Sequence, residues 1–259
     1  MESSPTVSDS PLQTNGKKKH TLIIAEAGIN MQGSLLQAKR MVDAAVKADA
    51  DIFKMQKYDP VRLLGPNSPF LLDAQSGQFS RLEYGEMSHY CSKKGIEFLV
   101  TLFHPEDIEM GEKYRFKRYK VASRSVVDTD LIKEIALTRK PVIMSCGMAD
   151  NAQVESALSI LANNDVTLLY CVCKYPTDKK DFDFTNMFKL WLRFRKPVGF
   201  SNHCPEVWPS VKAAGLGASV LENHFTMSRK LHGCDQASSL EPNELTKLVS
   251  IVRELDKVP

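Results

Sequence analysis

The chain has 259 residues, of which 43% are hydrophobic and 25% are charged, and its formal net charge is +3 at pH 7. These values are typical of a globular protein, and the length suits one domain with a large core. Basic and acidic residues alternate along most of the chain. This pattern argues against a nucleic-acid-binding or membrane-surface protein, in which basic residues are usually concentrated. No apolar segment reaches the roughly 18–20 residues needed to cross a bilayer.

The first nineteen residues differ in composition from the rest of the chain. Residues 1–19 are rich in Ser, Thr, Pro and Lys and contain no hydrophobic segment, which predicts a disordered extension and excludes a secretory signal. The six cysteines form no C-x-x-C pair, and reduced thiols are expected in a chain without an export signal. We therefore expect a cytoplasmic protein. The cysteines are Cys91, Cys146, Cys171, Cys173, Cys204 and Cys234.

From residue 20 onward, short β-branched or aromatic segments alternate with helical stretches. Eight strands, each followed by a helix, imply parallel pairing through right-handed crossovers. We therefore predict a single (β/α)₈ TIM barrel over residues 20–259, with an open, doubly wound sheet as the alternative. The predicted strands are Thr21–Glu26, Asp51–Gln56, Glu97–Leu102, Arg118–Ala122, Pro141–Ser145, Val166–Cys171, Pro197–Ser201 and Ser219–His224. The predicted helices include Leu35–Ala48, Arg81–Lys93, Ala152–Asn163, Glu206–Ala214 and Glu244–Leu255.

Local signals mark two helix starts and the longest loop. Ser34 precedes an apolar run with helical spacing and is expected to cap that helix. Pro242, followed by acidic residues, suits the first turn of the last helix. Residues 57–79 are rich in Pro, Gly and Ser and predict an irregular insertion after the second strand. We expect this insertion to lie over the mouth of the barrel.

Polar residues stand where most of the predicted strands end. In a (β/α)₈ barrel, catalytic groups lie at the carboxyl ends of the strands, above an apolar interior. Burying such groups without partners costs a few kcal/mol each, so they should bind a ligand or one another. Two lysines with hydroxyl donors suit a substrate that carries a phosphate and a carboxylate, although a single inward Lys or Glu is more often part of an ion pair. The residues are Glu26, Lys54, Gln56, Thr101, Lys120, Ser123, Ser145, Ser201, His203, Glu222 and His224.

Two of these residues, His203 and His224, end neighbouring strands. Such strands lie roughly 4.8 Å apart, so two imidazoles at matching heights can bind one divalent transition metal whose other positions go to water or substrate. A hydrogen-bonded structural pair is the alternative. His20, His89, His104 and His232 have no comparable placement and are expected on the surface or in loops.

These residues lie in segments that resemble the sialic acid synthase family over nearly the whole chain. That resemblance implies the joining of phosphoenolpyruvate to an N-acetylhexosamine aldehyde, such as N-acetylmannosamine or its phosphate. The product would be a nine-carbon keto-sugar acid, phosphate would be released, and the cofactor would be a divalent metal, Mn²⁺ or Mg²⁺. The matching segments are IIAEAGIN at 23–30, FKMQKY at 53–58, YKVAS at 119–123, PVIMSCGM at 141–148, LLYC and YPTD within 168–178, GFSNH at 199–203, and ENHFT and ASSLEP within 222–242.

The resemblance also implies a role for each matching position. His203 and His224 match the metal ligands, Glu26 and Gln56 match positions near the reacting sugar, and Asp235 matches an aspartate that binds sugar hydroxyls. Glu26, Lys54 and Lys120 are the implied catalytic residues, with the two lysines stabilising charge on phosphate and carboxylate. The positions that match the phosphoenolpyruvate cradle are Lys54, Thr101, Lys120, Ser123, Ser145, Tyr175 and Ser201.

The chain departs from the family pattern at four positions. Met31 stands where a histidine is usual, Ser125 where an acid is usual, Cys173 where an asparagine is expected, and Asn202 where an aspartate is expected. The acid replaced by Ser125 is a candidate for handling the proton of the attacking water, a task that Glu26 or Asp128 could take over.

The family often carries a C-terminal antifreeze-like domain that reaches into a neighbouring subunit, whereas this sequence stops at Pro259. Either that domain was removed, or the barrel recognises its sugar without it. A homodimer is compatible with both alternatives. Beside a synthase, two other functions remain open. One is a non-catalytic barrel of the same descent that binds a ligand or a partner, and the other is a different metal-dependent aldolase or lyase.

Overall fold

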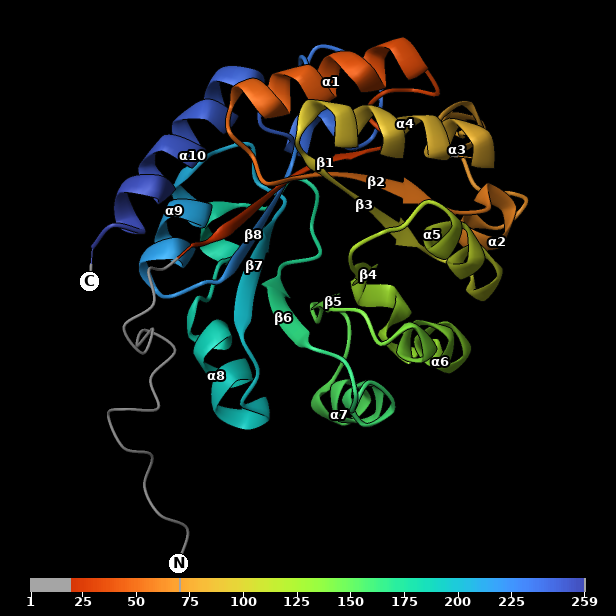
Figure 1. Cartoon of the computed structure of the whole chain (residues 1–259). Helices are drawn as coiled ribbons and strands as arrows, with labels where there is room; N and C mark the ends of the chain where they lie inside the picture. Colours follow the sequence, from red (N-terminus) through yellow and green to blue (C-terminus); the bar gives the residue numbers. More distant parts are fainter. Residues whose placement is uncertain (1–19, 70, 259) are drawn as a thin grey trace, which may run out of the picture.

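The structure is a computed structural model that describes residues 20–69 and 71–258, so the extension predicted over residues 1–19 lies outside the described residues. Eight parallel strands pair in chain order and close into a barrel, with β1 beside β8 (Figure 1). This closure confirms the (β/α)₈ barrel and excludes the open sheet. The strands are β1 (Leu22–Gly28), β2 (Ile52–Lys57), β3 (Glu97–Leu102), β4 (Tyr119–Val121), β5 (Val142–Ser145), β6 (Val166–Cys171), β7 (Val198–Asn202) and β8 (Val220–His224).

Helices surround the barrel on its outside (Figure 1). The two predicted helix starts are confirmed: the Ser34 side chain accepts a hydrogen bond from the Gln37 N–H, and Pro242 occupies the first turn of the last helix. In the part of the chain that the structure describes, no helix is long and apolar enough to cross a membrane. The helices are α1 (Leu35–Lys47), α2 (Pro60–Leu64), α3 (Leu71–Ser76), α4 (Arg81–Lys94), α5 (Ile108–Lys113), α6 (Thr129–Thr138), α7 (Asn151–Ile160), α8 (Thr185–Phe194), α9 (Trp208–Gly215) and α10 (Pro242–Leu255).

The insertion after β2 is more regular than predicted, because it contains the short helices α2 and α3. Asp59 caps α2 by accepting hydrogen bonds from the backbone N–H groups of Val61 and Arg62, a signal that the Asp59-Pro60 pair already carried in the sequence. The insertion packs beside the rim at the carboxyl ends of β2 and β3, and none of its described residues lines the cavity at that rim. Tyr58 packs edge-on against Phe103, which directly follows β3, with ring centroids 6.1 Å apart.

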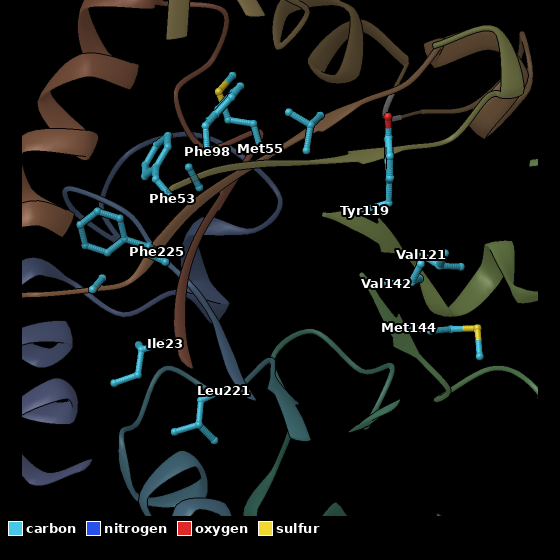
Figure 2. Packing of buried hydrophobic residues seen from close by; sticks show 14 of the residues in the cluster. Ile23, Phe53, Met55, Phe98, Tyr119, Val121, Val142, Met144, Leu221 and Phe225 are labelled. Carbon is cyan, nitrogen blue, oxygen red and sulfur yellow. The ribbon is translucent and has the colours of Figure 1, made fainter. Parts of the chain in front are cut away.

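The strands carry one apolar layer on the outside of the barrel and another on the inside, because successive side chains along a strand point to opposite faces. The residues that face outward from the strands pack against the helices, and Figure 2 shows part of this cluster, including Ile23, Phe53 and Leu221. The residues that face inward form a small separate layer in the barrel interior. Because alternate residues share a face, the polar residues two or four positions further along each strand also face inward, above this layer. The inner layer consists of Ile24, Ile52, Leu99, Ile143, Leu169 and Val220.

Gly199 in β7 occupies a position where the barrel leaves no room for a side chain. An added Cβ would lie 2.4 Å from the Val220 carbonyl oxygen and 2.6 Å from the Leu169 side chain. We expect Gly199→Ala to lower the free energy of unfolding by about 1–3 kcal/mol, measured by chemical denaturation. Gly215→Ala is the matched control, since nothing lies within 4 Å of its added Cβ, and it should be neutral or stabilising by up to about 1 kcal/mol. Equal stability of the two variants would contradict this packing.

Candidate active site

A cavity of about 290 Å³ opens at the carboxyl ends of the strands. Every predicted site residue except Asp235 lines it, so the strands bring together side chains that lie up to almost two hundred positions apart in sequence. The lining also includes residues absent from the predicted site. These are Phe103, Ala122, Arg124, Met148, Cys171, Cys173 and Glu222.

Lys54 lies at the bottom of this cavity and is almost completely buried. Its Nζ atom is 2.8 Å from Glu26 Oε2 and 3.6 Å from Glu222 Oε2, and it donates a hydrogen bond of 2.9 Å to Thr101 Oγ1. Burial acts to lower the pKa of Lys54, but the two carboxylates outweigh it and raise the pKa above its ordinary value. Lys54 is therefore a fixed cation held by its neighbours.

Lys120 is equally buried but less well compensated. Its ammonium group donates to Ser145 Oγ at 2.7 Å and to the Val121 carbonyl at 3.0 Å, and its nearest carboxylate oxygen, Glu222 Oε1, is 4.0 Å away. Burial lowers the pKa of Lys120 in spite of the attraction of Glu222. Since an ammonium group has three donors, one donor of Lys120 remains for a ligand in the cavity.

Glu222 joins the two lysines and was missing from the predicted site. It accepts a hydrogen bond of 3.1 Å from Ser201 Oγ, and its Oε2 atom is buried without a hydrogen bond. Burial would raise the pKa of Glu222, but the charges of Lys120 and Lys54 lower it below its ordinary value. Alternation along β8 had placed Glu222 on the inward face beside His224, which was the available signal.

The two histidines meet at the rim, with ring centroids 5.4 Å apart. His203 Nδ1 lies 2.6 Å from the Val172 carbonyl, so it donates, and the lone pair of Nε2 faces the Tyr175 hydroxyl at 3.0 Å. Burial, with the neighbouring His224, lowers the pKa of His203 to about 3, which keeps this imidazole neutral at pH 7. His224 Nδ1 is buried without a hydrogen bond.

These features fit a divalent metal held by the two imidazoles, because metal ligation needs an unprotonated ring nitrogen and buried nitrogens need partners. The remaining positions would go to substrate and water. No group of three His, Cys, Asp or Glu side chains suited to a metal occurs among residues 20–69 and 71–258.

Asp235 lies outside the cavity lining but next to it, with Oδ2 4.0 Å from His224 Nδ1. Gly28 lies close to three polar side chains. A Cβ atom added to this glycine would be 3.3 Å from Asp235 Oδ2, 3.4 Å from Glu26 Oε1 and 3.5 Å from Gln56 Nε2. Gln56 Nε2 donates to Glu26 Oε1 at 2.8 Å. These three residues therefore form one polar group beside the histidines.

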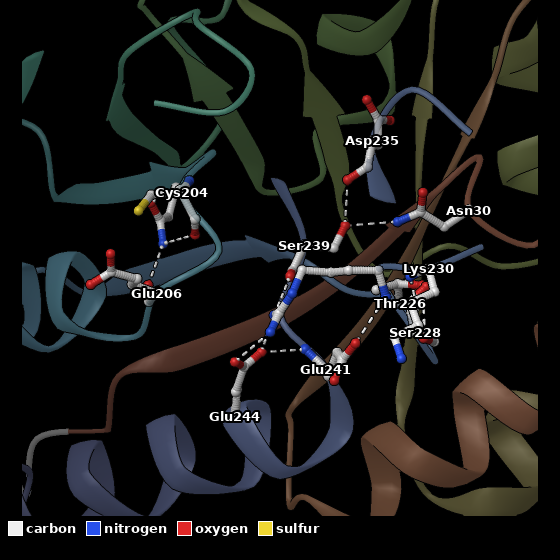
Figure 3. Close-up of polar contacts among 12 residues, drawn as sticks. Asn30, Cys204, Glu206, Thr226, Ser228, Lys230, Asp235, Ser239, Glu241 and Glu244 are labelled. Atoms are coloured by element: carbon white, nitrogen blue, oxygen red, sulfur yellow. Dashed lines mark hydrogen bonds and ion pairs between the residues drawn. The ribbon is translucent and has the colours of Figure 1, made fainter. Parts of the chain in front are cut away.

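A buried hydrogen-bond chain fixes the loop that carries Asp235, and Figure 3 shows it. Asn30 Nδ2 donates to Ser239 Oγ at 2.9 Å, and Ser239 Oγ donates to the Asp235 carbonyl at 2.7 Å. Arg229, on the same loop, donates through its backbone N–H to Glu241 and through its guanidinium to Glu244 on α10. The loop after β8 is thus anchored to β1 on one side and to α10 on the other.

The four departures from the family pattern occupy different surroundings. Ser125 is buried in the 3₁₀ turn Ser123–Val127 and does not line the cavity. Asp128 caps α6 by accepting from the Leu131 N–H, so it is not available to replace an acid in the cavity. Met31 is buried in the core. Asn202 donates to the Cys204 carbonyl and to Asn223 Oδ1, and Cys173 lines the cavity.

The fold and the rim together define a (β/α)₈ barrel with a polar cavity, lined by two buried lysines and two histidines, at the carboxyl ends of its strands. The profile of the NeuB family matches residues 41–258, and the chain belongs to this family. The resemblance seen in the sequence is therefore confirmed.

Named relatives are similar over most of this chain. The N,N'-diacetyllegionaminic acid synthase of Campylobacter jejuni is 32% identical, over 92% of this chain and 77% of its own length. The N-acetylneuraminate-9-phosphate synthase of Drosophila melanogaster is 30% identical, over 92% of this chain and 69% of its own. The crystal structure of the sialic acid synthetase of Leptospira borgpetersenii, in complex with citrate, superimposes with a TM-score of 0.90 at 31% identity, over 93% of this chain and 85% of that one. These relatives are synthases of related sugar acids, and their names differ in the acid.

Proposed function

We propose that this protein condenses phosphoenolpyruvate with an N-acetylhexosamine aldehyde, N-acetylmannosamine, its phosphate or a related sugar, to give a nine-carbon keto-sugar acid and phosphate. The observation that carries the proposal is the single cavity that contains both buried lysines, the hydroxyl donors and the histidine pair. The family membership and the citrate bound to the Leptospira protein, itself a polycarboxylate, support an anionic substrate.

The phosphoenolpyruvate end of the cavity is assigned to Lys54, Lys120 and the hydroxyls around them. Lys120 has a free donor, and Ser145 and Thr101 hold the two ammonium groups in place. In a cavity with little water, cations fixed in this way stabilise negative charge on phosphate and carboxylate without reorganising during the reaction. The exposed Arg124 lines the mouth and adds a further cation.

The sugar end is assigned to Glu26, Gln56 and Asp235, which converge above Gly28. The enol carbon of phosphoenolpyruvate attacks the aldehyde carbon, water adds to the resulting cation, and phosphate leaves from the tetrahedral intermediate. We assign proton handling to Glu26, because it lies at the sugar end beside Gln56, whereas the other carboxylate of the cavity, Glu222, lies between the two lysines. Ser125 and Asp128 lie outside the cavity lining. His203 and His224 would hold the divalent metal, Mn²⁺ or Mg²⁺, whose contribution when bound is to polarise the aldehyde oxygen.

A second function, a ligand-binding barrel without turnover, is favoured by one observation. Ser125 leaves no acid on the turn after β4, and Arg124 lines the cavity there instead. Loss of a general base costs about 10²–10⁴-fold in rate. The two functions share the anion site and differ in whether phosphate is released.

Phosphate release separates them. The protein is incubated with phosphoenolpyruvate, manganese and each member of a panel of N-acetylhexosamines, with and without a 6-phosphate. The proposal predicts phosphate release that requires both substrates. No release with any hexosamine, together with calorimetric binding of phosphoenolpyruvate, would contradict the synthase and support the binding barrel.

The metal assignment makes a separate prediction. His203→Ala and His224→Ala are each expected to abolish stoichiometric binding of Mn²⁺, because removal of one imidazole leaves a single protein ligand from the pair. Bound manganese is counted by electron paramagnetic resonance on protein whose circular dichroism shows an intact barrel. His89→Ala, on the exposed side of α4, is the matched control and should bind one equivalent. One retained equivalent in both site variants would refute the assignment.

A further inference from the structure

Two cysteine thiols meet at the edge of the cavity. Cys171 is the last residue of β6 and Cys173 follows two positions later, so in an extended segment their side chains point to the same side. Both thiols line the cavity. An added Cβ on Gly147 would lie 2.6 Å from Cys171 Sγ and 2.8 Å from Cys173 Sγ. Both sulfur atoms therefore lie within 3 Å of one point, and the absence of a side chain on Gly147 leaves the space that they occupy.

The surroundings of the two thiols differ in a way that suits a reactive pair. Cys171 is buried, and its Sγ is 3.1 Å from Ser123 Oγ, whereas Cys173 is exposed to solvent. Interaction with the Cys171 thiol, helped by Ser123 and by the charge of Lys120, lowers the pKa of Cys173 to about 6. The Cys171 pKa is raised well above its usual value, chiefly by the same partner and by burial. The accessible thiol, Cys173, is therefore the more readily ionised of the two, and the buried thiol of Cys171 lies beside it.

We propose that Cys171 and Cys173 form a peroxide-sensitive dithiol at the anion end of the cavity, which closes reversibly to a disulfide. The Cys173 thiolate attacks one oxygen of a hydroperoxide, the O–O bond breaks, and the other oxygen leaves as water or alcohol after taking a proton. Cys173 is then a sulfenic acid. The Cys171 thiol attacks that sulfur, the S–O bond breaks, and hydroxide takes the thiol proton and leaves as water. The peroxide is reduced by two electrons, and the two thiols are oxidised by two.

Closure changes the anion site. The disulfide removes the Cys171 thiol from its contact with Ser123, whose hydroxyl also accepts the Gly147 N–H at 3.1 Å. It also draws the Cys173 sulfur toward Cys171, which lines the same cavity as Lys120 and interacts with the charge of Lys120. Both changes affect residues assigned to the phosphate of phosphoenolpyruvate. Oxidation is therefore expected to weaken phosphoenolpyruvate binding, and a dithiol reductant is expected to restore it.

The test detects the disulfide between Cys171 and Cys173 directly, by mass spectrometry. Its outcome therefore does not depend on whether the protein catalyses the proposed condensation. Full-length protein is treated with hydrogen peroxide at pH 7, remaining thiols are alkylated, and the peptide that contains both cysteines is sequenced. The proposal predicts loss of two hydrogens from the Cys171–Cys173 pair and recovery with dithiothreitol. It also predicts that, in untreated protein, iodoacetamide alkylates Cys173 at least roughly tenfold faster than Cys234, because the surroundings lower the pKa of Cys173 and raise that of Cys234. Cys234 is the other exposed cysteine, and burial raises its pKa to about 12.

Substitutions identify the two sulfur atoms. Cys171→Ser is expected to stop the reaction at a sulfenic acid on Cys173, trapped by dimedone, and Cys173→Ser is expected to leave Cys171 unoxidised. Cys234→Ser is the matched control and should form the disulfide as the wild type does. The proposal is overturned if peroxide leaves both thiols free, or if the disulfide recovered joins either cysteine to Cys146. Equal alkylation rates of Cys173 and Cys234 would also contradict it.

Discussion

Replacement of Lys120 by methionine is expected to reduce phosphate release from phosphoenolpyruvate by about a thousandfold. Removal of one fixed donor from an oxyanion site costs about 10²–10³-fold in rate, and here the lost group also carries a full charge. Methionine has a similar length and no charge, so the barrel keeps its packing. Ser145 loses its partner at 2.7 Å, and Glu222 loses the weaker of its two cations. The measurement is steady-state phosphate release with the best hexosamine of the panel.

Lys117→Met is the matched control, because Lys117 is exposed and lies just before β4, at the opposite end of the strand from the cavity. It should retain the wild-type rate. A Lys120→Met enzyme that releases phosphate within about threefold of wild type would remove Lys120 from the anion site. If the affinity for phosphoenolpyruvate falls by the same factor as the rate of phosphate release, Lys120 stabilises the bound substrate as much as it stabilises the transition state.

Replacement of Lys54 by methionine is expected to have its largest effect on folding. Lys54 is the cation between two buried carboxylates, Glu26 at 2.8 Å and Glu222 at 3.6 Å. Loss of one partner of a buried ion pair costs about 3–5 kcal/mol, because it leaves an uncompensated charge in a medium of low polarity. We expect the free energy of unfolding to fall by about this amount in urea titrations.

The double variant Lys54→Met/Glu26→Gln tests the cause of this loss. Glutamine removes the charge nearest to the vacated position, so the double variant should recover about 1–2 kcal/mol relative to Lys54→Met alone. Lys133→Met removes an exposed lysine that pairs with Asp130 on α6 and should change stability by less than about 0.5 kcal/mol. A Lys54→Met protein as stable as the Lys133→Met control would contradict the buried network.

The barrel and the identity of the rim residues could be predicted from sequence because both depend on local periodicity. Strand alternation decides which side chains face inward, and parallel closure brings all carboxyl ends to one rim. For this reason the sequence alone could place Lys54, Thr101 and His224 at the rim, where the structure shows them lining the cavity. Glu222 was recognised as inward-facing but left out of the site, because a single inward carboxylate usually belongs to an ion pair. It does form one, with both lysines.

Residues on the connecting segments could not be placed in the same way, because loops have no period. The 3₁₀ turn after β4 buries Ser125 and leaves Arg124 at the cavity, and nothing in the local sequence indicates which of the two faces inward. Asp235 reaches the site through a long-range chain of contacts with Asn30 and Ser239. The approach of Cys171 and Cys173 depends on Gly147 in a neighbouring loop, which is again a tertiary feature.

Carbon–carbon bond formation is the central claim, and an isotope label tests it directly. Phosphoenolpyruvate labelled with ¹³C at C3 is incubated with the protein, manganese and the accepted hexosamine, and the products are identified by NMR and mass spectrometry. The account predicts that the label appears as the methylene carbon next to the keto group of a nine-carbon acid, in an amount equal to the phosphate released. Recovery of the label in pyruvate, or only in unreacted phosphoenolpyruvate, would contradict it.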